Sequence, residues 1–317
     1  MKIKKAEVGN RTVRKKSFIE NIYHYRHAYI LILPSLLAVT IFLYLPLMGV
    51  ILAFKDYNIY DGLWGSDWVG LKNFITVFKQ PAMMKAVGNT VWLSFAIIFG
   101  TLPFPILLAV MFNEIWNTRF KKVVQTISYL PHFLSWVSVV GLCYALLSTE
   151  GAINNLLIKV LGDDYVAKNF LMESKYFVPI SYFTSLWKNL GWETVIYMAS
   201  IAGIDGALYE AATMDGAGKL RQTWNITLPS IKQTIIVVLV MRLGSVFNAN
   251  FEMVYGLQNV FTIDDTEIIS TLIYRSGIQN GNYSVATAFG LLQGLITITL
   301  ILAANALSKK IAEVSIW

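Results

Sequence analysis

The chain has 317 residues, of which 56% are hydrophobic and only 14% are charged, and its formal net charge is +7. A soluble domain carries about a quarter charged residues, so this composition excludes an ordinary water-soluble fold and indicates a protein solvated by lipid. Eight Lys or Arg residues lie among the first 26 positions, before any apolar run. A basic end beside an apolar run is typical of a cytoplasmic membrane face, and it argues against a nucleic-acid partner.

Residues 1–28 are predicted to form a cytoplasmic basic tail, and residues 29–317 a six-span membrane domain. The tail mixes Phe18, Ile19 and Ile22 with lysines, arginines and histidines, a pattern that predicts an interfacial helix at anionic lipid headgroups. The first apolar run begins near Tyr29, exceeds 20 residues and lacks a small-residue cleavage site. We therefore expect a retained anchor and not a signal peptide.

Six stretches are long and apolar enough to cross the membrane, since a span needs about 20 apolar residues. The second contains Pro103 and Pro105, which should kink it. The predicted spans are 29–54, 88–112, 127–147, 178–202, 231–255 and 284–307.

The charges between the spans set their orientation. With both termini inside, the cytoplasmic segments carry most of the loop lysines and arginines. The three opposite loops contain more acidic than basic residues. This agrees with the positive-inside rule, so we expect a multi-pass protein of the cytoplasmic membrane with both termini in the cytoplasm.

One external loop contains apolar residues at helical spacing, from Ile153 to Leu161. This predicts a short amphipathic helix outside the membrane. It is interpreted either as a lid packed on the bundle or as a docking surface for an external protein.

Several chemistries have no signature in this sequence. No phosphate-binding loop occurs: the nearest stretch, residues 216–219, lacks both the spacing and the hydroxyl residue. The three histidines do not cluster with carboxylates, so no metal site is expected. No serine lies in a nucleophile turn, and the single Cys143 lies in an apolar run. The chain is therefore not expected to be an enzyme.

Residues 205–229 are mostly polar and lie between two apolar runs, in the fourth-to-fifth span loop on the predicted cytoplasmic side. Asp205 can cap a helix that begins near Gly206. Asp215 and Gly216 form a turn signal, in which Gly216 can take a backbone conformation closed to other residues.

A second short helix is predicted from about Lys219 to Ile226, and Pro229 fits the first turn of span five. The product is a helix–turn–helix elbow that projects from the bundle. Ala211 and Ala212 give it a slim face that can enter a groove on a partner, and Glu210 offers a charge for a basic rim.

The spacing of this segment resembles the EAA loop of binding-protein-dependent ABC importer permeases. The pattern is Glu210-Ala211-Ala212, three residues, Gly216, nine residues, Ile226, one residue, Leu228-Pro229, and every fixed position is matched. The resemblance extends over the whole set of spans. It is greatest to the maltose-type carbohydrate branch, especially to permeases for oligosaccharides of acidic polysaccharides such as alginate or pectin, through residues 250–255 and 283–288.

The resemblance implies an all-α, type I importer permease in which the elbow is the contact to an ATPase. The residues implied in this coupling are Glu210, Ala211, Ala212, Asp215, Gly216, Ile226, Leu228 and Pro229. The implied partners are a second, unlike permease subunit, two ATP-binding subunits, an extracytoplasmic solute-binding protein, an oligosaccharide and membrane lipid. ATP and Mg would be bound by the ATPase subunits, with no cofactor in this chain.

Polar residues inside the spans are candidates for the substrate pathway, because charges there are costly and usually face a wet cavity. Sugars need flat apolar faces and convergent hydrogen-bonding groups, and an excess of cations fits an acidic sugar. The candidates are Lys188, Asn189, Trp192, Glu193, Tyr197, Arg242, Asn248, Asn250, Glu252, Tyr255 and Gln293.

Other interpretations stay open at this point. Lys188 and Glu193 could snorkel to the outer interface, and Arg242 could pair with a neighbouring carboxylate. The substrate could be a neutral oligosaccharide. The chain could instead be an ATP-independent secondary transporter, or a membrane sensor or scaffold without transport.

Overall fold

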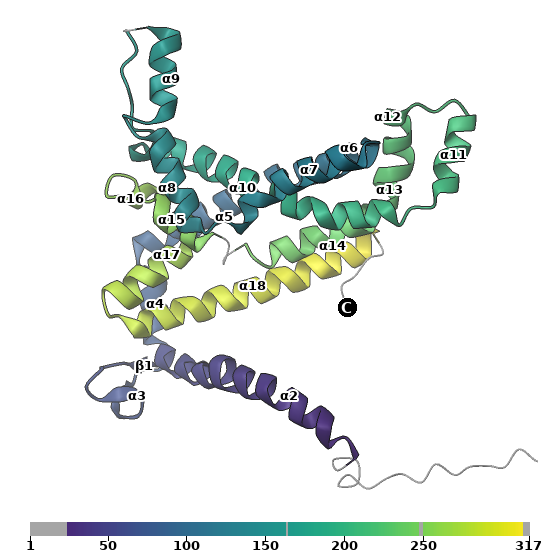
Figure 1. The fold of residues 1–317 in the computed structure, drawn as a ribbon. Helices are drawn as coiled ribbons and strands as arrows, with labels where there is room; N and C mark the ends of the chain where they lie inside the picture. The colour runs from purple at the N-terminus through teal and green to yellow at the C-terminus, as the bar shows by residue number, and fades with distance from the viewer. Residues whose placement is uncertain (1–23, 163, 247–249, 313–317) are drawn as a thin grey trace, which may run out of the picture. The chain divides into compact units, whose positions relative to one another are not determined.

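The computed structural model describes residues 24–162, 164–246 and 250–312, and this part of the chain is mostly helical (Figure 1). The predicted tail with its interfacial helix lies almost entirely outside the described residues, and so does the pathway candidate Asn248. The chain divides into two compact units, residues 1–51 and 52–317. The boundary predicted after residue 28 stays a prediction.

The first unit consists mainly of one long helix with an exposed apolar surface. Helix α2 (Arg26–Val39) continues through a π-helical turn, η1 (Thr40–Tyr44), into a 3-10 stretch, η2 (Leu45–Phe54). Neither α2 nor η1 has a buried residue, although nearly all of their side chains are apolar. This surface is compatible with lipid as the solvent and confirms the first predicted span as a helix of 29 residues, Arg26–Phe54.

The second unit begins with a small two-stranded element. Strands β1 (Lys55–Asp56) and β2 (Asp67–Trp68) pair antiparallel around α3 (Gly62–Gly65), and α4 (Lys72–Lys79) follows. Buried Lys55 donates to the carbonyl oxygens of Leu63, Trp64 and Ser66, which compensates its charge. The all-α prediction holds apart from this two-residue ladder.

The second predicted span is confirmed as a long apolar helical stretch, Pro81–Glu114, and its predicted kink stays a prediction. It consists of α5 (Pro81–Thr101) and α6 (Pro103–Glu114), which meet at Leu102, directly before Pro103. Proline has no N–H and interrupts the hydrogen-bond ladder, so the chain changes helix there.

The third predicted span, 127–147, is wrong as a single helix. Helix α7 (Thr118–Tyr129) ends in a 3-10 turn, η3 (Leu130–Phe133), and α8 (Trp136–Leu147) starts anew with Ser135 as its cap. Pro131 removes one backbone donor, and the Ser135 hydroxyl accepts from the Ser138 amide at 3.1 Å. The helix predicted over 153–161 is present as α9 (Ala152–Leu161).

The fifth predicted span, 231–255, is also wrong as a single helix. Helix α14 (Lys232–Leu243) has 12 residues, about 18 Å at 1.5 Å per residue, and ends at Gly244. Asn250 then adopts a left-handed conformation with φ of 72°, and α15 (Phe251–Leu257) follows. Such a residue cannot continue a right-handed helix, so α15 is a separate helix from α14.

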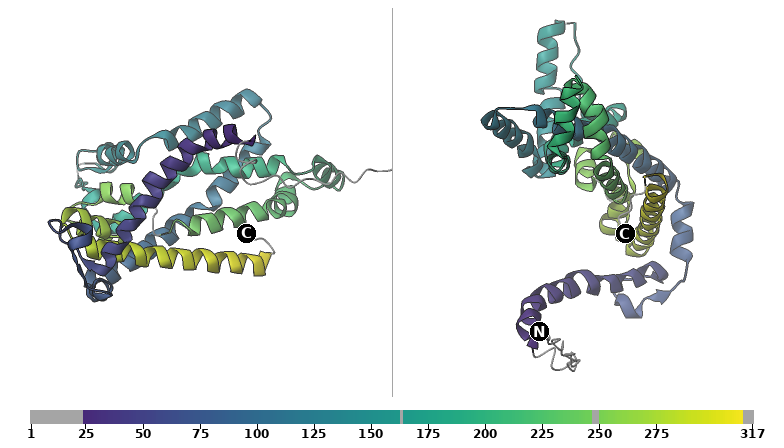
Figure 2. Two further views of the ribbon diagram at one scale, coloured as in Figure 1. Left: turned by 90° about the horizontal axis from the view of Figure 1, so that it is seen from below. Right: turned by 90° about the vertical axis from the view of Figure 1, so that its right-hand side faces the viewer.

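The remaining helices complete the second unit. A 3-10 turn, η4 (Phe170–Met172), precedes α10 (Ser174–Ala202), which contains the predicted fourth span. After α15 come α16 (Ile263–Thr266), α17 (Ile269–Tyr274), a π-helical turn η6 (Arg275–Gln279) and α18 (Tyr283–Ala312), which contains the predicted sixth span. Helices α14 and α18 lie side by side (Figures 1 and 2).

Four helices of the described residues are long and apolar enough to cross a membrane, or five if the bent pair Lys219–Ser230 and Lys232–Leu243 counts as one span. They are Arg26–Phe54, Pro81–Glu114, Trp136–Leu161 and Tyr283–Lys310. Helix α10 has 29 residues but is not among them, and its middle carries Lys188 and Glu193. The chain is thus a multi-pass membrane protein, whereas the count of six stays a prediction.

Helix α10 is the centre of the bundle. It packs along α5, α6 and α7, and Tyr182 donates to the carbonyl oxygen of Gly100 at 2.9 Å. At Gly191 it comes so close to α7 that an added Cβ would lie 2.1 Å from the carbonyl oxygen of Ser128. This close approach requires glycine and fixes the polar middle of α10 against the break in the third span.

Candidate functional site

The elbow begins with a capped helix, as the sequence predicts. Helix α11 (Gly206–Met214) starts after Asp205, whose carboxylate accepts from the Ala207 amide at 3.0 Å. It ends at Gly216, which has a φ of +74°. The chain then reverses, and the Ala217 amide donates to the Ala212 carbonyl at 2.9 Å.

The second arm of the elbow is a helical stretch of three segments, in which a π-helical turn lies between two short α-helices. Helix α12 (Lys219–Gln222) passes into a π-helical turn, η5 (Thr223–Thr227), and then α13 (Leu228–Ser230). Buried Gln222 donates to the Thr213 hydroxyl at 2.9 Å and to the Ala217 carbonyl at 3.1 Å. Tyr209 and Thr227 share a further hydrogen bond of 2.9 Å. These bonds make the two arms one rigid element.

The elbow projects from the end of the bundle where α6 ends, as Figure 1 shows. Lys219 forms an ion pair of 3.0 Å with Glu114, the last residue of α6. The chain bends by 59° between Ser230 and Lys232. Pro229 therefore lies in the second arm and not, as predicted, in the first turn of span five, because the bend comes after it.

Most of the predicted coupling residues are exposed on this element, and Ala212, Asp215 and Ile226 line a cavity between its arms. Glu210, Ala211, Asp215, Gly216 and Pro229 are exposed, and Ala212, Ile226 and Leu228 are half-buried. A cavity of about 270 Å³ with a largely polar lining lies between the arms, beside Asp215 and Arg221.

Three large apolar side chains on the elbow are missing from the sequence-based prediction. Met214, Leu220 and Trp224 are 88%, 79% and 70% exposed, although the surrounding segment is polar. Apolar surface that is exposed and surrounded by polar residues is typical of a protein contact. The sequence does contain a signal for this contact surface, because large apolar residues are unusual in a stretch that is otherwise polar.

Lys188 of α10 supports the break in the third span. It is buried, and its ammonium donates to the carbonyl oxygens of His132 and Leu134, both at 2.7 Å, and lies 5.3 Å from the centre of the Trp136 ring. Carbonyl groups freed by the broken helix need such a donor in a medium without water. Lys188 neither snorkels outward nor stands free for a ligand in this structure.

Glu193 and Arg242 form an ion pair between α10 and α14, as the alternative interpretation of Arg242 expects. Arg242 also donates to the Ile98 carbonyl at 3.1 Å and the Thr101 hydroxyl at 3.2 Å, both on α5. Tyr197 is fully buried one turn after Glu193, and its hydroxyl has no hydrogen-bond partner among the described residues. These groups hold three helices together.

An aromatic group lies beside the same break. The His132 and Trp192 rings stack in parallel with centroids 4.7 Å apart, and His132 shares a hydrogen bond of 3.2 Å with Asn189. Trp192 is 50% exposed and the adjacent Phe133 72% exposed. The sequence indicated Asn189 and Trp192 but not His132 or Phe133, whose place depends on the break.

The remaining pathway candidates gather around α15 and α18. Tyr255 packs against Phe251 and Tyr274, and its hydroxyl accepts from the Gln279 amide at 3.1 Å. Asn250 is half-buried and Glu252 exposed, while buried Gln293 of α18 lines a cavity together with Phe251 and Tyr274. The structure therefore divides the described candidates into three groups.

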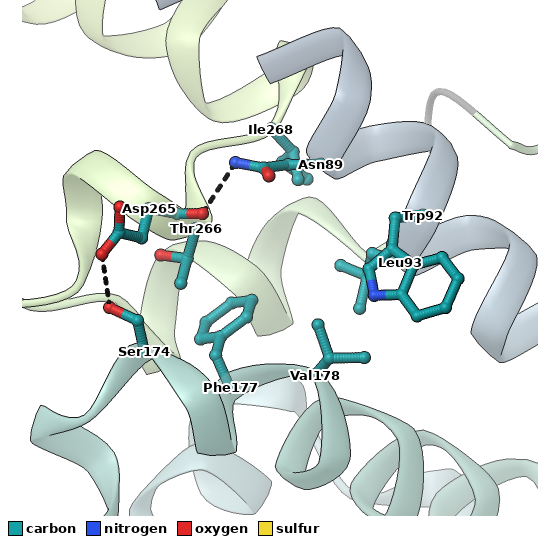
Figure 3. Close-up of a pocket in the computed structure, with 9 residues that line it drawn as sticks. All are labelled: Asn89, Trp92, Leu93, Ser174, Phe177, Val178, Asp265, Thr266 and Ile268. Carbon is teal, nitrogen blue, oxygen red and sulfur yellow. Dashed lines mark hydrogen bonds between the residues drawn. The ribbon is translucent and has the colours of Figure 1, made fainter. Parts of the chain in front are cut away.

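A small cavity of about 50 Å³ lies between α5, the start of α10 and the loop at α16 (Figure 3). Asp265 accepts hydrogen bonds from Lys85 at 2.8 Å and Ser174 at 3.0 Å, and both bonds hold the pKa of this carboxyl below its usual value. Asn89 donates to the Asp265 carbonyl at 2.8 Å. This junction joins the three elements at one end of the bundle.

No group of three metal-ligating side chains occurs among the described residues. What these residues offer is a rigid projecting elbow, cross-linked helices and exposed aromatic rings beside polar groups. Such an arrangement can transmit movement and accompany a polar solute.

Comparisons with known proteins agree with this description. Residues 101–313 match the family described as binding-protein-dependent transport system inner membrane component. Over 307 residues, the chain is 40% identical to the polygalacturonan/rhamnogalacturonan transport system permease protein YteP of Bacillus subtilis, which covers 96% of this chain and 94% of that protein. It is also 40% identical to protein LplB of the same organism, over 89% of this chain and 88% of that protein.

Solved structures give the same result. A chain in the crystal structure of a bacterial alginate ABC transporter, in complex with an alginate pentasaccharide-bound periplasmic protein, superposes with a TM-score of 0.85 at 37% identity. The match covers 95% of this chain and 100% of that chain. The chain therefore belongs to the family of inner membrane components of binding-protein-dependent transport systems.

Proposed function

We propose that this chain is a permease subunit of an ABC importer that moves an acidic oligosaccharide across the cytoplasmic membrane with ATP hydrolysed by partner subunits. The observation that carries the proposal is the elbow, residues 205–230. It is rigid, projects from the bundle and exposes Met214, Leu220 and Trp224 to a partner.

In this proposal the chain crosses the membrane six times with both termini in the cytoplasm. Helix α10 supplies the fourth span, although its middle carries charged residues. Helix α14 supplies the fifth span, although it has only 12 residues. The basic loops then face the cytoplasm, in agreement with the positive-inside rule. The elbow lies on the side where ATP is available.

The elbow is suited to act as a lever. Helix α10 leads into it through residues 203–205, and the second arm leads into α14 through the 59° bend. A movement of the elbow would thus displace both helices, which the Arg242–Glu193 pair joins further along. Two ATP-binding subunits would receive this elbow and that of a second, unlike permease subunit.

On the outer side, a solute-binding protein would deliver the sugar, as expected for this family. Helix α9 projects from the bundle beyond α8 (Figure 1), and its Leu156, Val160 and Leu161 side chains are exposed. This favours the docking interpretation of α9 over that of a packed lid.

The acidic nature of the substrate is supported by the relatives, one named for polygalacturonan and rhamnogalacturonan and the other solved with alginate. The cations of the spans do not add to it, because Lys188 and Arg242 are engaged by acceptors within the chain. We propose that sugar contacts come from the group of Asn189 and Trp192 and from that of Asn250, Glu252, Tyr255 and Gln293. Lys188, Glu193, Tyr197 and Arg242 would hold the helices around them.

The lever is tested by Glu210→Lys in a complex reconstituted into proteoliposomes. The substitution should abolish sugar uptake and its coupled ATP hydrolysis without unfolding the spans. Glu150→Lys is the matched control, since Glu150 is also an exposed carboxylate but lies in a predicted external loop. Normal coupled activity of the Glu210→Lys complex would refute the role of the elbow, and uptake independent of ATP would favour a secondary transporter.

A further inference from the structure

A cavity of about 600 Å³ lies among Phe251 of α15, α17, η6 and the first half of α18. Figure 1 shows these elements side by side, at the end of α18 away from the elbow. In the proposed orientation this is the outer mouth of the pathway. The volume is in the range of sites that hold small organic ligands.

Aromatic rings supply the flat surfaces of the cavity. Phe251 and Tyr274 line it, with ring centroids 5.4 Å apart, and Tyr283 lines it from the start of α18. Tyr255 supports the pair from behind: it stacks on Phe251 at 5.5 Å and contacts the edge of Tyr274 at 5.1 Å. Three rings in mutual contact cannot turn freely, so the surface that they offer is preorganised.

One hydroxyl in the lining is left without a bond. The Ser270 oxygen is buried and has no hydrogen-bond partner among the described residues. A buried polar atom without a partner destabilises the folded protein, so its retention requires a reason. A ligand hydroxyl in the cavity would provide the missing partner, beside the further polar side chains Thr287 and Gln293.

The described lining contains no charged residue. Arg275 lies 5.8 Å from the centre of the Tyr255 ring and is held by Glu267 at 2.5 Å and by the Gln258 side chain at 2.9 Å. A carboxylate in this cavity would therefore lack a counter-charge. Aromatic faces with neutral hydrogen-bonding groups match the other part of a sugar, its C–H faces and hydroxyls.

We propose that this cavity is a subsite for the uncharged face of a pyranose ring, with Phe251 and Tyr274 as stacking surfaces and Ser270 as the hydrogen-bonding group. The proposal rests on the proposed function and makes it more specific. The subsite binds acidic and neutral oligosaccharides alike. Residues outside this cavity discriminate between the two kinds of sugar.

The first experiment measures occupancy of the cavity in the complete complex by cysteine protection. Cys143→Ala removes the only cysteine, and Gly290→Cys then places a thiol in the lining, where an added Cβ meets nothing within 4 Å. Gly88→Cys is the control, because Gly88 is equally open, exposed and outside the cavity. The rate of labelling by a membrane-impermeant maleimide is measured with trigalacturonate, trimannuronate or maltotriose.

Each of the sugars that binds should slow labelling at position 290 at least about fivefold at saturation and leave position 88 unchanged. Protection by none of the three would overturn the subsite. Protection by the acidic sugars alone would overturn its indifference to charge. This readout needs no transport, so it decides the subsite even if uptake of all three sugars fails and the proposed function with it.

The second experiment uses two serine hydroxyls that are buried and lack hydrogen-bond partners among the described residues. Ser270→Ala should raise the KM for uptake about fivefold, the loss of one hydrogen bond, and leave the melting temperature of the complex unchanged or higher. Ser181→Ala is the matched control, since Ser181 is buried and without a partner in the described chain but lies outside the cavity. Its KM should not change.

Tyr274→Ala should raise the same KM about tenfold, by loss of a stacking surface, with the second permease still co-purifying. Equal KM values for the Ser270→Ala complex and the wild type would contradict the subsite. Two results together would show that the cavity is a subunit interface: the second permease is lost from the Tyr274→Ala complex, and position 290 is not labelled by the maleimide even without sugar. This outcome would also overturn the proposal.

Discussion

The guanidinium of Arg242 on α14 pairs with the carboxylate of Glu193 on α10, 49 residues earlier in the chain. The same guanidinium reaches the backbone of α5 at Ile98. Two helices that flank the elbow are thereby tied to a third, so this pair holds the bundle together beside the elbow.

Arg242→Met should lower the free energy of unfolding by about 2–3 kcal/mol, because it leaves the largely buried Glu193 without its counter-charge. The double variant Glu193→Leu/Arg242→Met should recover to within about 1 kcal/mol of the wild type, since no unpaired charge remains. Thermal unfolding in lipid nanodiscs gives the comparison. Selective loss of acidic-sugar uptake that the double variant does not relieve would instead place Arg242 in contact with substrate.

Lys188→Met should destabilise the protein by about 1–3 kcal/mol, because the His132 and Leu134 carbonyls lose their donor. The ratio of acidic to neutral sugar uptake should not change. Lys175→Met on the same helix is the control, since Lys175 is exposed and contacts the neighbouring Glu173 and Tyr176 side chains. A stable Lys188→Met protein with an altered substrate preference would show that Lys188 contacts the sugar.

Gly191→Ala should destabilise the protein by about 2 kcal/mol or more, since its Cβ would collide with the Ser128 carbonyl and push α10 from α7. Gly88→Ala on α5 has open space and should be neutral or stabilising by up to about 1 kcal/mol. Melting temperatures of the two variants provide the measurement. Equal values would mean that α7 and α10 do not approach as closely as described.

The Lys85–Asp265–Ser174 junction should weaken in acid. Its hydrogen bonds lower the pKa of Asp265 from 3.8, so the folded state binds this proton less readily than the unfolded state. The resulting stabilisation is present above the unfolded pKa and is lost as the pH falls through the folded pKa. Unfolding followed from about pH 5 to about pH 3 should thus show a smaller loss of stability for Asp265→Asn than for the wild type. Identical profiles would contradict this role.

The elbow could be predicted from the sequence because its determinants are local. Asp205 caps α11, Gly216 makes the reversal and Lys219 begins α12, all within one short polar segment. Its exposed apolar side chains could not be assigned, because exposure depends on the bundle that the segment leaves.

The broken spans and the roles of the charges could not be predicted for a physical reason. Residues 130–135 are mostly apolar, so composition does not reveal the break. Pro131 is a local signal of it, but Lys188, which donates to the freed carbonyl oxygens, lies more than 50 residues away. Arg242 finds its backbone acceptor at Ile98, 144 residues earlier. Only the folded chain distinguishes a cation in a pathway from one that holds helices together.

The central claim is that this chain forms the path of an ATP-driven importer of acidic oligosaccharides. The most direct test is uptake of trigalacturonate and maltotriose into proteoliposomes that contain the full complex and ATP, with the binding protein outside. The account predicts ATP-dependent accumulation of trigalacturonate that exceeds that of maltotriose. Accumulation without ATP, or accumulation of maltotriose alone, would contradict it.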